Sequence, residues 1–144
     1  MEQSEVDEFA ATISQRVGFA LALHLATQHM HRLIRALHEE HGHIQEVIVQ
    51  NFRAKSSTKM AEAPEPDLDD LMWTLAVARL TFGPEMNLQA PPNLTPSAYP
   101  RLIAAGLNDW GGVSPVTPDH VNPEAPWPEI VRLQENTERA GKVL

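Results

Sequence analysis

The sequence has no cysteine among its 144 residues. This absence removes any disulfide framework, and it also removes the thiolates that usually hold iron–sulfur clusters. Long hydrophobic runs are missing as well, because the most apolar stretch, 17–26, includes His24 and is shorter than the ~20 residues of a membrane span. The first residues are acidic rather than basic, unlike a signal peptide. A cytoplasmic protein without a membrane partner is expected.

Positive charge is also scarce, with 11 Lys and Arg against 19 Asp and Glu and a net charge of −8. Such a balance argues against nucleic acids or anionic membranes as partners. The hydrophobic content of 42% is ordinary for a globular protein. The length suffices for one domain with a modest core, whereas a complete (β/α)₈ barrel takes roughly 250 residues.

Proline is absent before residue 64, and all 12 prolines follow. The first part, 5–41, has apolar residues at i, i+4 spacing and predicts one or two helices that end at Gly42. The nearly continuous β-branched run 44–52 follows directly and predicts a strand buried on both faces.

Helices and strands are predicted to alternate through the proline-containing part. Asp67 is expected to cap a helix that ends at Gly83-Pro84, with an inward stripe of Leu68, Leu71, Met72, Leu75 and Leu80. The later elements are a strand at 86–90, a helix from 95 or 97 to 105, a strand at 107–110, and a helix at 128–141 with Ile130, Val131 and Leu133 inward. This order predicts a parallel α/β fold of about three βα units.

Polar residues lie at or just after the carboxyl end of each predicted strand, where parallel barrels carry their chemistry. Amides can read the polar edge of a flat ring, and an indole can stack on a flat ligand. Each of these residues also has an ordinary structural role open to it, loop capping for the amides and core packing for the aromatics. As a set they predict a substrate-binding site made of Gln50, Asn51, Phe52, Gln89, Asn93, Asn108, Asp109, Trp110, Gly111, Gly112 and Ser114.

Several stretches, taken in chain order, carry a family resemblance. They are LHEEHGHIQEVIVQNFRAK at 37–55, APEPDLDDL at 63–71, QAPPNL at 89–94 and the polar, glycine- and proline-rich run at 106–128. Together they resemble the C-terminal part of FO synthases. These are radical S-adenosylmethionine (SAM) enzymes, CofG-type in their single-domain form, that build the deazaflavin 7,8-didemethyl-8-hydroxy-5-deazariboflavin. Residues 1–31 do not resemble the family, so we expect a helical N-terminal segment there and part of a barrel domain over 32–144.

The resemblance implies an incomplete radical-SAM-type barrel, a partial TIM barrel behind a long N-terminal helix. The whole enzyme would use a 4Fe-4S cluster and SAM to close a ring in an adduct of tyrosine and 5-amino-6-ribitylaminouracil. This chain lacks the family's C-x-x-x-C-x-x-C loop and glycine-rich SAM strand, so we expect no cofactor on it, no catalytic residue assignable, and no activity alone. The expected partners are the small-molecule substrate and either an N-terminal radical SAM half or a second copy at the exposed edge of 44–52.

Other functions stay open from the residues themselves. A binding or interaction module would keep the ligand-facing wall without turnover. Arg53, Lys55 and Lys59 can hold a carboxylate or phosphate, although a solvated loop is the favoured explanation for them. A metal protein is suggested by six of the seven histidines lying within 24–43, with His24, His31 and His38 repeating every seven residues. However, His38-Glu39-Glu40-His41 has its second histidine one residue too early for the zinc motif H-E-x-x-H.

Overall fold

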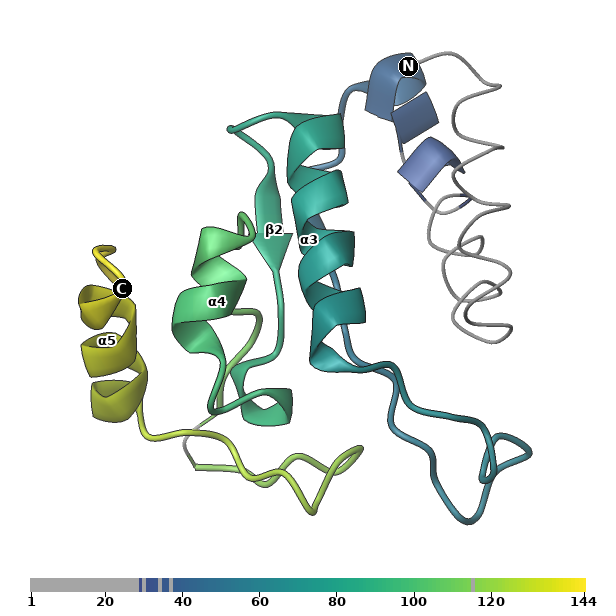
Figure 1. The fold of residues 1–144 in the computed structure, drawn as a ribbon, viewed down its shortest axis with the longest axis vertical. Helices are drawn as coiled ribbons and strands as arrows, with labels where there is room; N and C mark the ends of the chain where they lie inside the picture. The colour runs from purple at the N-terminus through teal and green to yellow at the C-terminus, as the bar shows by residue number, and fades with distance from the viewer. Residues whose placement is uncertain (1–28, 30, 34, 37, 115) are drawn as a thin grey trace. The chain divides into compact units, whose positions relative to one another are not determined.

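The computed structural model describes residues 29, 31–33, 35–36, 38–114 and 116–144 (Figure 1). The chain divides into two compact units, 1–42 and 43–144. The described residues of the first unit are helical up to His41, and an exposed ion pair joins Arg35 to Glu39 one turn later. Most of the predicted helix 5–41 lies outside the described residues. The boundary expected at residue 31 from the family resemblance stays a prediction.

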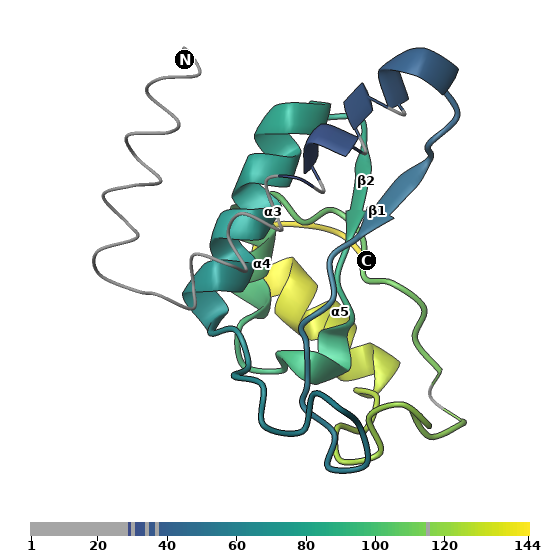
Figure 2. The same ribbon diagram turned by 90° about the vertical axis from the view of Figure 1, so that its right-hand side faces the viewer.

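The second unit contains β1 (Glu46–Ile48), α3 (Leu68–Phe82), β2 (Asn87–Gln89), the 3₁₀ turn η1 (Pro92–Leu94), α4 (Tyr99–Ala104) and α5 (Ile130–Arg139). Strands β1 and β2 run parallel and side by side, with Val47 opposite Leu88 (Figure 2). The predicted strand at 107–110 is reduced to a single parallel bridge between Gln89 and Asp109. The mixed, parallel arrangement of helix and strand agrees with the predicted α/β class.

Helix α3 begins where the sequence predicts. The Asp67 side chain accepts a hydrogen bond from the Asp70 backbone N–H, and Asp70 accepts one in return from the Asp67 backbone, which forms a complete capping box. The helix ends at Gly83, whose φ of 80° lies in the left-handed region that favours glycine. Leu71 and Leu75 are buried, but Leu80 is 85% exposed, so the predicted inward stripe is wrong at that position.

The hydrophobic core lies among α3, α4, α5 and the segment after Gly106. Helix α4 packs on both α3 and α5, and α3 packs on β2. The core is formed by Leu71, Leu75, Ala90, Ala98, Tyr99, Leu102, Leu107, Trp110 and Leu133. In α5 the prediction holds for Leu133 and fails for Ile130 and Val131, which are exposed because the short helix turns one narrow face to α4.

Strand β1 is covered on one face, which corrects the prediction of a strand buried on both. Val47 is buried, whereas Glu46 and Ile48 are exposed, Ile48 by 53%. Alternate side chains of a strand point to opposite faces, so burial of Val47 alone means that packing reaches one side. Within the described residues, the other face of β1 therefore leaves one charged side chain, Glu46, and one apolar side chain, Ile48, exposed.

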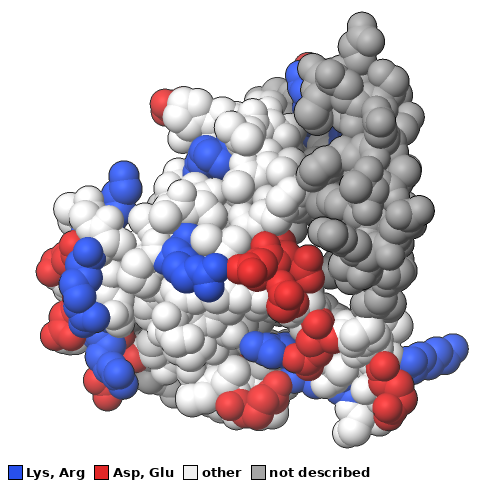
Figure 3. Space-filling model, in the orientation of Figure 1, with Lys and Arg blue, Asp and Glu red and all other residues white. Residues whose placement is uncertain are grey.

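Acidic and basic side chains are mixed over the described part of the face shown in Figure 3. Figure 3 shows them side by side over α5 and between α3 and α4, with no large patch of one sign on that face. Arg101 of α4 and Asp69 of α3 form one such exposed pair, with Nη2 and Oδ1 2.7 Å apart. No described helix has the length and hydrophobicity needed to cross a bilayer.

Candidate functional site

Gln89 lies at the centre of the polar residues on the open side of the sheet. Its Nε2 donates to Glu46 Oε2 at 2.7 Å and to Asp109 Oδ2 at 2.8 Å. One amide therefore connects β1, β2 and the segment 107–110, called the bridging segment because Asp109 bridges to Gln89. Gln89 is buried, while Asp109 is exposed. Sequence reasoning selected Gln89 and Asp109 but missed Glu46. The signal was available, because Glu46 is the charged residue of an otherwise apolar strand.

The two glycines after Trp110 differ in their surroundings. A Cβ on Gly111 would lie 3.3 Å from Gln89 Oε1, whereas a Cβ on Gly112 would meet nothing within 4 Å. Gly111 therefore lets the backbone pass close to the Gln89 amide. Ser114, also in the predicted set, shares a hydrogen bond with the Thr117 hydroxyl. Its hydroxyl thus has a local partner in the loop.

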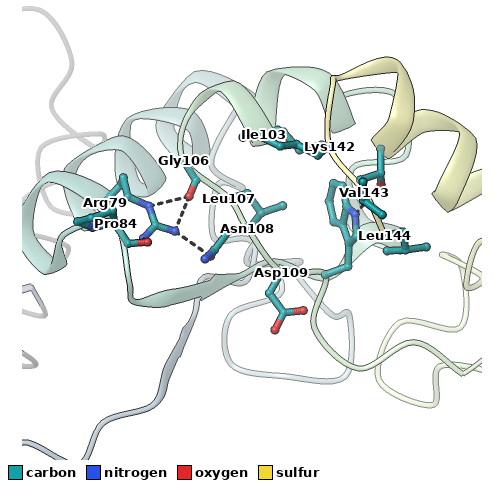
Figure 4. Close-up of a pocket in the computed structure, with 12 residues that line it drawn as sticks. Arg79, Pro84, Ile103, Gly106, Leu107, Asn108, Asp109, Lys142, Val143 and Leu144 are labelled. Carbon is teal, nitrogen blue, oxygen red and sulfur yellow. Dashed lines mark hydrogen bonds between the residues drawn. The ribbon is translucent and has the colours of Figure 1, made fainter.

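The Asn108 side chain bonds Arg79 and the backbone of β2, and it does not join the Gln89 group of polar residues. Its Oδ1 accepts from Arg79 Nη2 at 2.7 Å and from the Leu88 backbone N–H at 2.8 Å. Figure 4 shows the Arg79 guanidinium reaching Gly106 and Asn108, with the Asp109 carboxylate directed away from them. These residues line a cavity of about 480 Å³ at the amino ends of the strands, which also reaches the C-terminal residues Lys142, Val143 and Leu144.

Trp110 belongs to the core. Its Nε1 donates to Thr137 Oγ1 at 2.9 Å, and its ring lies 4.8 Å from the Tyr99 ring at an interplanar angle of 60°. A tilted aromatic pair of this kind is a favourable packing arrangement. Its position fits the core-packing role that the sequence left open, and its edge still contributes to the 480 Å³ cavity.

A second cavity, of about 600 Å³, lies at the carboxyl ends of β1 and β2. The segment after β1 supplies Arg53 and Lys55, and the segment after β2 supplies Asn93. Arg53 joins the two segments, since its Nη2 donates to the Leu94 carbonyl at 2.9 Å. The full lining is Arg53, Ala54, Lys55, Ser56, Glu65, Asn93, Leu94, Pro96, Glu124 and Ala125.

Both cations of this cavity have carboxylate partners. Arg53 Nη1 bonds Glu65 Oε2 at 2.7 Å, and Lys55 Nζ bonds Glu124 Oε1. The hydrogen bond from Arg53 lowers the pKa of Glu65, and the one from Lys55 lowers the pKa of Glu124, so both acids stay ionised at neutral pH. The cavity rim is therefore close to electrically neutral. The sequence singled out Arg53 and Lys55 but gave no signal for Glu65 or Glu124, which lie far from them along the chain.

Three buried oxygen atoms near these strand ends have no hydrogen-bond partner. They belong to the side chains of Asn51, Asn93 and Thr95. Asn51 and Asn93 are among the predicted site residues, and Thr95 was missed. Of the other residues predicted after β1, Gln50 is exposed and Phe52 is half-buried. Buried polar atoms are seldom left unpaired in proteins, so these three oxygens are exceptions to the usual pairing.

Asp119 anchors the proline-rich loop to this cavity. Its carboxylate accepts hydrogen bonds from the backbone N–H groups of Val121 and Asn122, and from the side-chain amides of Asn93 and Asn122. These bonds, the Asn122 backbone bond foremost, lower the Asp119 pKa from 3.8 to about 2. The loop at 119–125 is thus fixed to Asn93 by an ionised carboxylate.

This arrangement predicts an acid-sensitive loop. The folded-state pKa of Asp119 lies below its unfolded value, so its contribution to stability is complete above 3.8 and is lost as the pH falls towards about 2. We expect the free-energy difference of unfolding between the wild type and Asp119→Asn to shrink over that interval. Urea unfolding at a series of pH values measures it. Asp69→Asn, at an exposed carboxylate, is the matched control, and an equal pH profile for both variants would contradict the prediction.

The histidines of the first unit do not assemble a metal site in the part of the chain that is described. There, no three His, Asp or Glu side chains lie close enough together to hold a metal ion. His31 is buried, and this burial lowers its pKa. His24 lies outside the described residues.

Comparison with known proteins identifies the relatives of this chain. It is 59% identical over 109 residues to the FO synthase of Mycobacterium tuberculosis, covering 75% of this chain and 13% of that protein. The FO synthase of Mycobacterium leprae is 52% identical over 129 residues, with coverage of 89% and 15%. The matched part of this chain belongs to the FO synthase family. A 7,8-didemethyl-8-hydroxy-5-deazariboflavin synthase of Methanopyrus kandleri is 55% identical over 108 residues, covering 75% of this chain and 32% of that protein.

The chain therefore spans between 13% and 32% of the length of these FO synthase relatives. No protein-family model matches the chain, and no solved structure matches it. The family resemblance carried by the four sequence stretches is confirmed.

Proposed function

We propose that this chain forms part of the substrate-facing wall of an FO synthase that makes deazaflavin in the cytoplasm. It would be the C-terminal part of a CofG-type radical SAM barrel, a partial TIM barrel of about three βα units. Support comes from identity of 52% or more to FO synthases together with the polar cavity at the carboxyl ends of two parallel strands. In α/β barrels this end of the strands carries the active site.

The residues of this chain do not fit the family's iron–sulfur cluster. Thiolates are the usual cluster ligands, and the sequence has no cysteine. The cluster and the SAM that it activates would belong to another part of the whole enzyme. The role left to this chain is to bind, orient and shield the substrate, an adduct of tyrosine and 5-amino-6-ribitylaminouracil.

The proposed division of labour among the candidate residues follows from their contacts. Gln50, Asn51, Asn93, Asp109 and the Gly111-Gly112 backbone would face the substrate, because they lie at the strand ends or on the uncovered side of the sheet. Gln89 would fix the Asp109 and Glu46 carboxylates in place. Asn108, Trp110, Phe52 and Ser114 would support these residues from behind.

The uncovered face of β1 would receive the rest of the barrel. Glu46, Ile48 and Gln50 point to that face and are exposed. The relatives contain at least two thirds of their length beyond the matched part. The favoured partner is therefore the N-terminal radical SAM half, and self-association through the free edge of β1 is the alternative.

Complementation tests this function. The chain and a family enzyme truncated to lack the matching part are purified separately, reconstituted anaerobically with iron and sulfide, and given SAM and the two substrates. We expect no deoxyadenosine or fluorescent deazaflavin from the chain alone and SAM-dependent deazaflavin from the mixture. Product from the chain alone would refute its inactivity.

A chimera covers the case in which the two pieces do not assemble. Residues 43–144 replace the matching part of a full-length family enzyme. We expect a folded chimera to make deazaflavin, and a folded chimera that binds SAM without making product would refute the substrate-wall role. The wild-type family enzyme, expressed and reconstituted in parallel, is the control.

A further inference from the structure

One wall of the cavity at the carboxyl ends of β1 and β2 is firmly attached. Arg53 joins the segment after β1 to the segment after β2, since its Nη2 donates to the Leu94 carbonyl at 2.9 Å. Its Nη1 bonds Glu65 Oε2, and Glu65 Oε1 accepts a hydrogen bond from the Ala54 backbone N–H at 2.9 Å. The Leu94 side chain is buried, with 4% of its surface exposed. Backbone hydrogen bonds and a buried apolar side chain therefore fix this wall.

Another wall of the same cavity belongs to the loop 119–125, which is attached differently. Every residue of this loop is described, and none of its hydrophobic side chains is fully buried, because Val121 is 68% exposed and Ala125 is half-buried. The buried residue of the loop is the polar Asn122. Burial of apolar surface is the main force that holds a segment in a folded protein, and this loop has little of it. Its position therefore depends on polar contacts.

Two side chains supply the hydrogen bonds and ion pairs that attach this loop to the other described residues. Asn93 donates through Nδ2 to Asp119 Oδ2 at 2.8 Å and to the Ala125 carbonyl at 2.9 Å. Lys55 forms an ion pair with Glu124, and these two side chains are 29% and 59% exposed. Exposed ion pairs stabilise a fold only slightly and are screened by salt. The loop is thus held by a few contacts, one of which responds to ionic strength.

We infer that the loop 119–125 is a flap that forms one wall of the cavity and opens when the ion pair between Lys55 and Glu124 breaks. Opening separates the loop from Asn93 and takes away the wall that Glu124 and Ala125 provide, while the wall fixed to the core stays in place. The flap would control entry of the substrate, a role that rests on the proposed function. The opening itself is a property of this chain.

The Asn93 side-chain amide reports the opening directly. Both of its Nδ2 protons are donated to the flap, and the residue is 4% exposed, so exchange of these protons with water requires separation from Asp119 and Ala125. Asn87 is exposed, and its side chain makes no hydrogen bond to another described residue, so it gives the unprotected reference in the same NMR spectrum. The ratio of the two exchange rates measures how often the flap is open.

Removing the cation of the ion pair should open the flap more often. We expect Asn93 side-chain exchange to rise about 2–5-fold in Lys55→Met, the effect of losing one exposed ion pair. Raising NaCl to about 1 M should have a similar effect on the wild type and little further effect on the variant, because salt screens the same pair. Exchange that responds neither to the variant nor to salt would overturn the flap.

Lys59→Met is the matched control, because Lys59 is an exposed lysine of the same segment that does not line the cavity. Glu124→Gln removes the other charge of the ion pair. We expect Lys55→Met and Glu124→Gln combined to raise exchange no more than either alone, since both break the same contact. An equal rise in Lys59→Met, or additive effects of the two variants, would overturn the assignment of this ion pair.

Two core residues show whether the opening is local. Leu75 and Leu88 are fully buried, and their backbone amides exchange only when the second unit unfolds. We expect their exchange to stay unchanged in Lys55→Met and at high salt. Acceleration of these amides equal to that of the Asn93 side chain would mean that the loop separates only on global unfolding, which rejects the flap.

The outcome is distinguishable from that of the proposed function, because amide exchange in the chain requires no turnover. Salt-dependent exchange at Asn93, combined with failure of the chimera to make deazaflavin, would keep the flap and reject the enzyme role. An active chimera in which Asn93 exchange is unaffected by Lys55→Met and by salt would keep the enzyme role and reject the flap.

Discussion

Replacing Arg79 with methionine is expected to lower the free energy of unfolding of the second unit by about 3 kcal/mol or more. The guanidinium donates to the carbonyl oxygens of Gly83, Pro84, Met86 and Gly106 and to Asn108 Oδ1, at 2.7–3.1 Å. It therefore joins the end of α3, the start of β2 and the start of the bridging segment. Methionine keeps much of the apolar stem and leaves these acceptors without donors.

Urea unfolding monitored by tryptophan fluorescence measures this effect. Arg101→Met is the matched control, because Arg101 forms an exposed pair with Asp69 and such pairs contribute about 0–1 kcal/mol. Similar losses in the two variants would mean that the Arg79 contacts are no more important than a surface pair. Arg79→Lys should recover little of the stability, since one ammonium cannot reach acceptors on three segments.

The second large effect is expected at Gly106. Its φ is 110°, and a Cβ there would lie 2.7 Å from Arg79 Cβ and 2.8 Å from Arg79 Cγ. Gly106→Ala must therefore adopt a backbone conformation unfavourable for L-residues and also displace the stem of Arg79. Backbone strain and overpacking each cost on the order of 1–3 kcal/mol, so we expect a loss of about 2–6 kcal/mol.

Gly141→Ala separates the two contributions. Gly141 also has a positive φ, of 76°, but a Cβ there would meet nothing within 4 Å. The stability difference between the two alanine variants then measures the collision with Arg79. Equal losses, from the same urea titration, would show that the contact between Gly106 and Arg79 relaxes at no cost.

The element order of the second unit was predictable because it depends on local signals. Asp67 caps α3, Gly83 ends it, and Pro91-Pro92 ends β2, each through its own backbone chemistry. Which hydrophobic side chains are buried was less predictable. Ile48, Leu80 and Val131 are hydrophobic and follow the expected spacing, yet they are exposed, since burial depends on which neighbours are present rather than on the residue itself.

The residues of the candidate site also divide into those that were predictable from the sequence and those that were not. Asn93, Gln89 and Asp109 were predictable from their places at or after the ends of strands, and the structure brings Gln89 and Asp109 into contact. Arg79 was missed because its partners are mostly backbone carbonyls, which leave no trace in the sequence. Asp119 lies within the polar run that the sequence flagged, but its link to Asn93 spans 26 residues and depends on the folded loop.

Asn93 both lines the cavity and bonds the proline-rich loop, so it connects the two. Its amide nitrogen fixes Asp119 and Ala125, and the residue itself lines the cavity. A ligand that holds this amide in place makes loop opening more costly by its own binding free energy. The amides of Val121 and Asn122, which bond Asp119, should then exchange with deuterium more slowly when the cavity is filled, so loop protection reports occupancy from a distance.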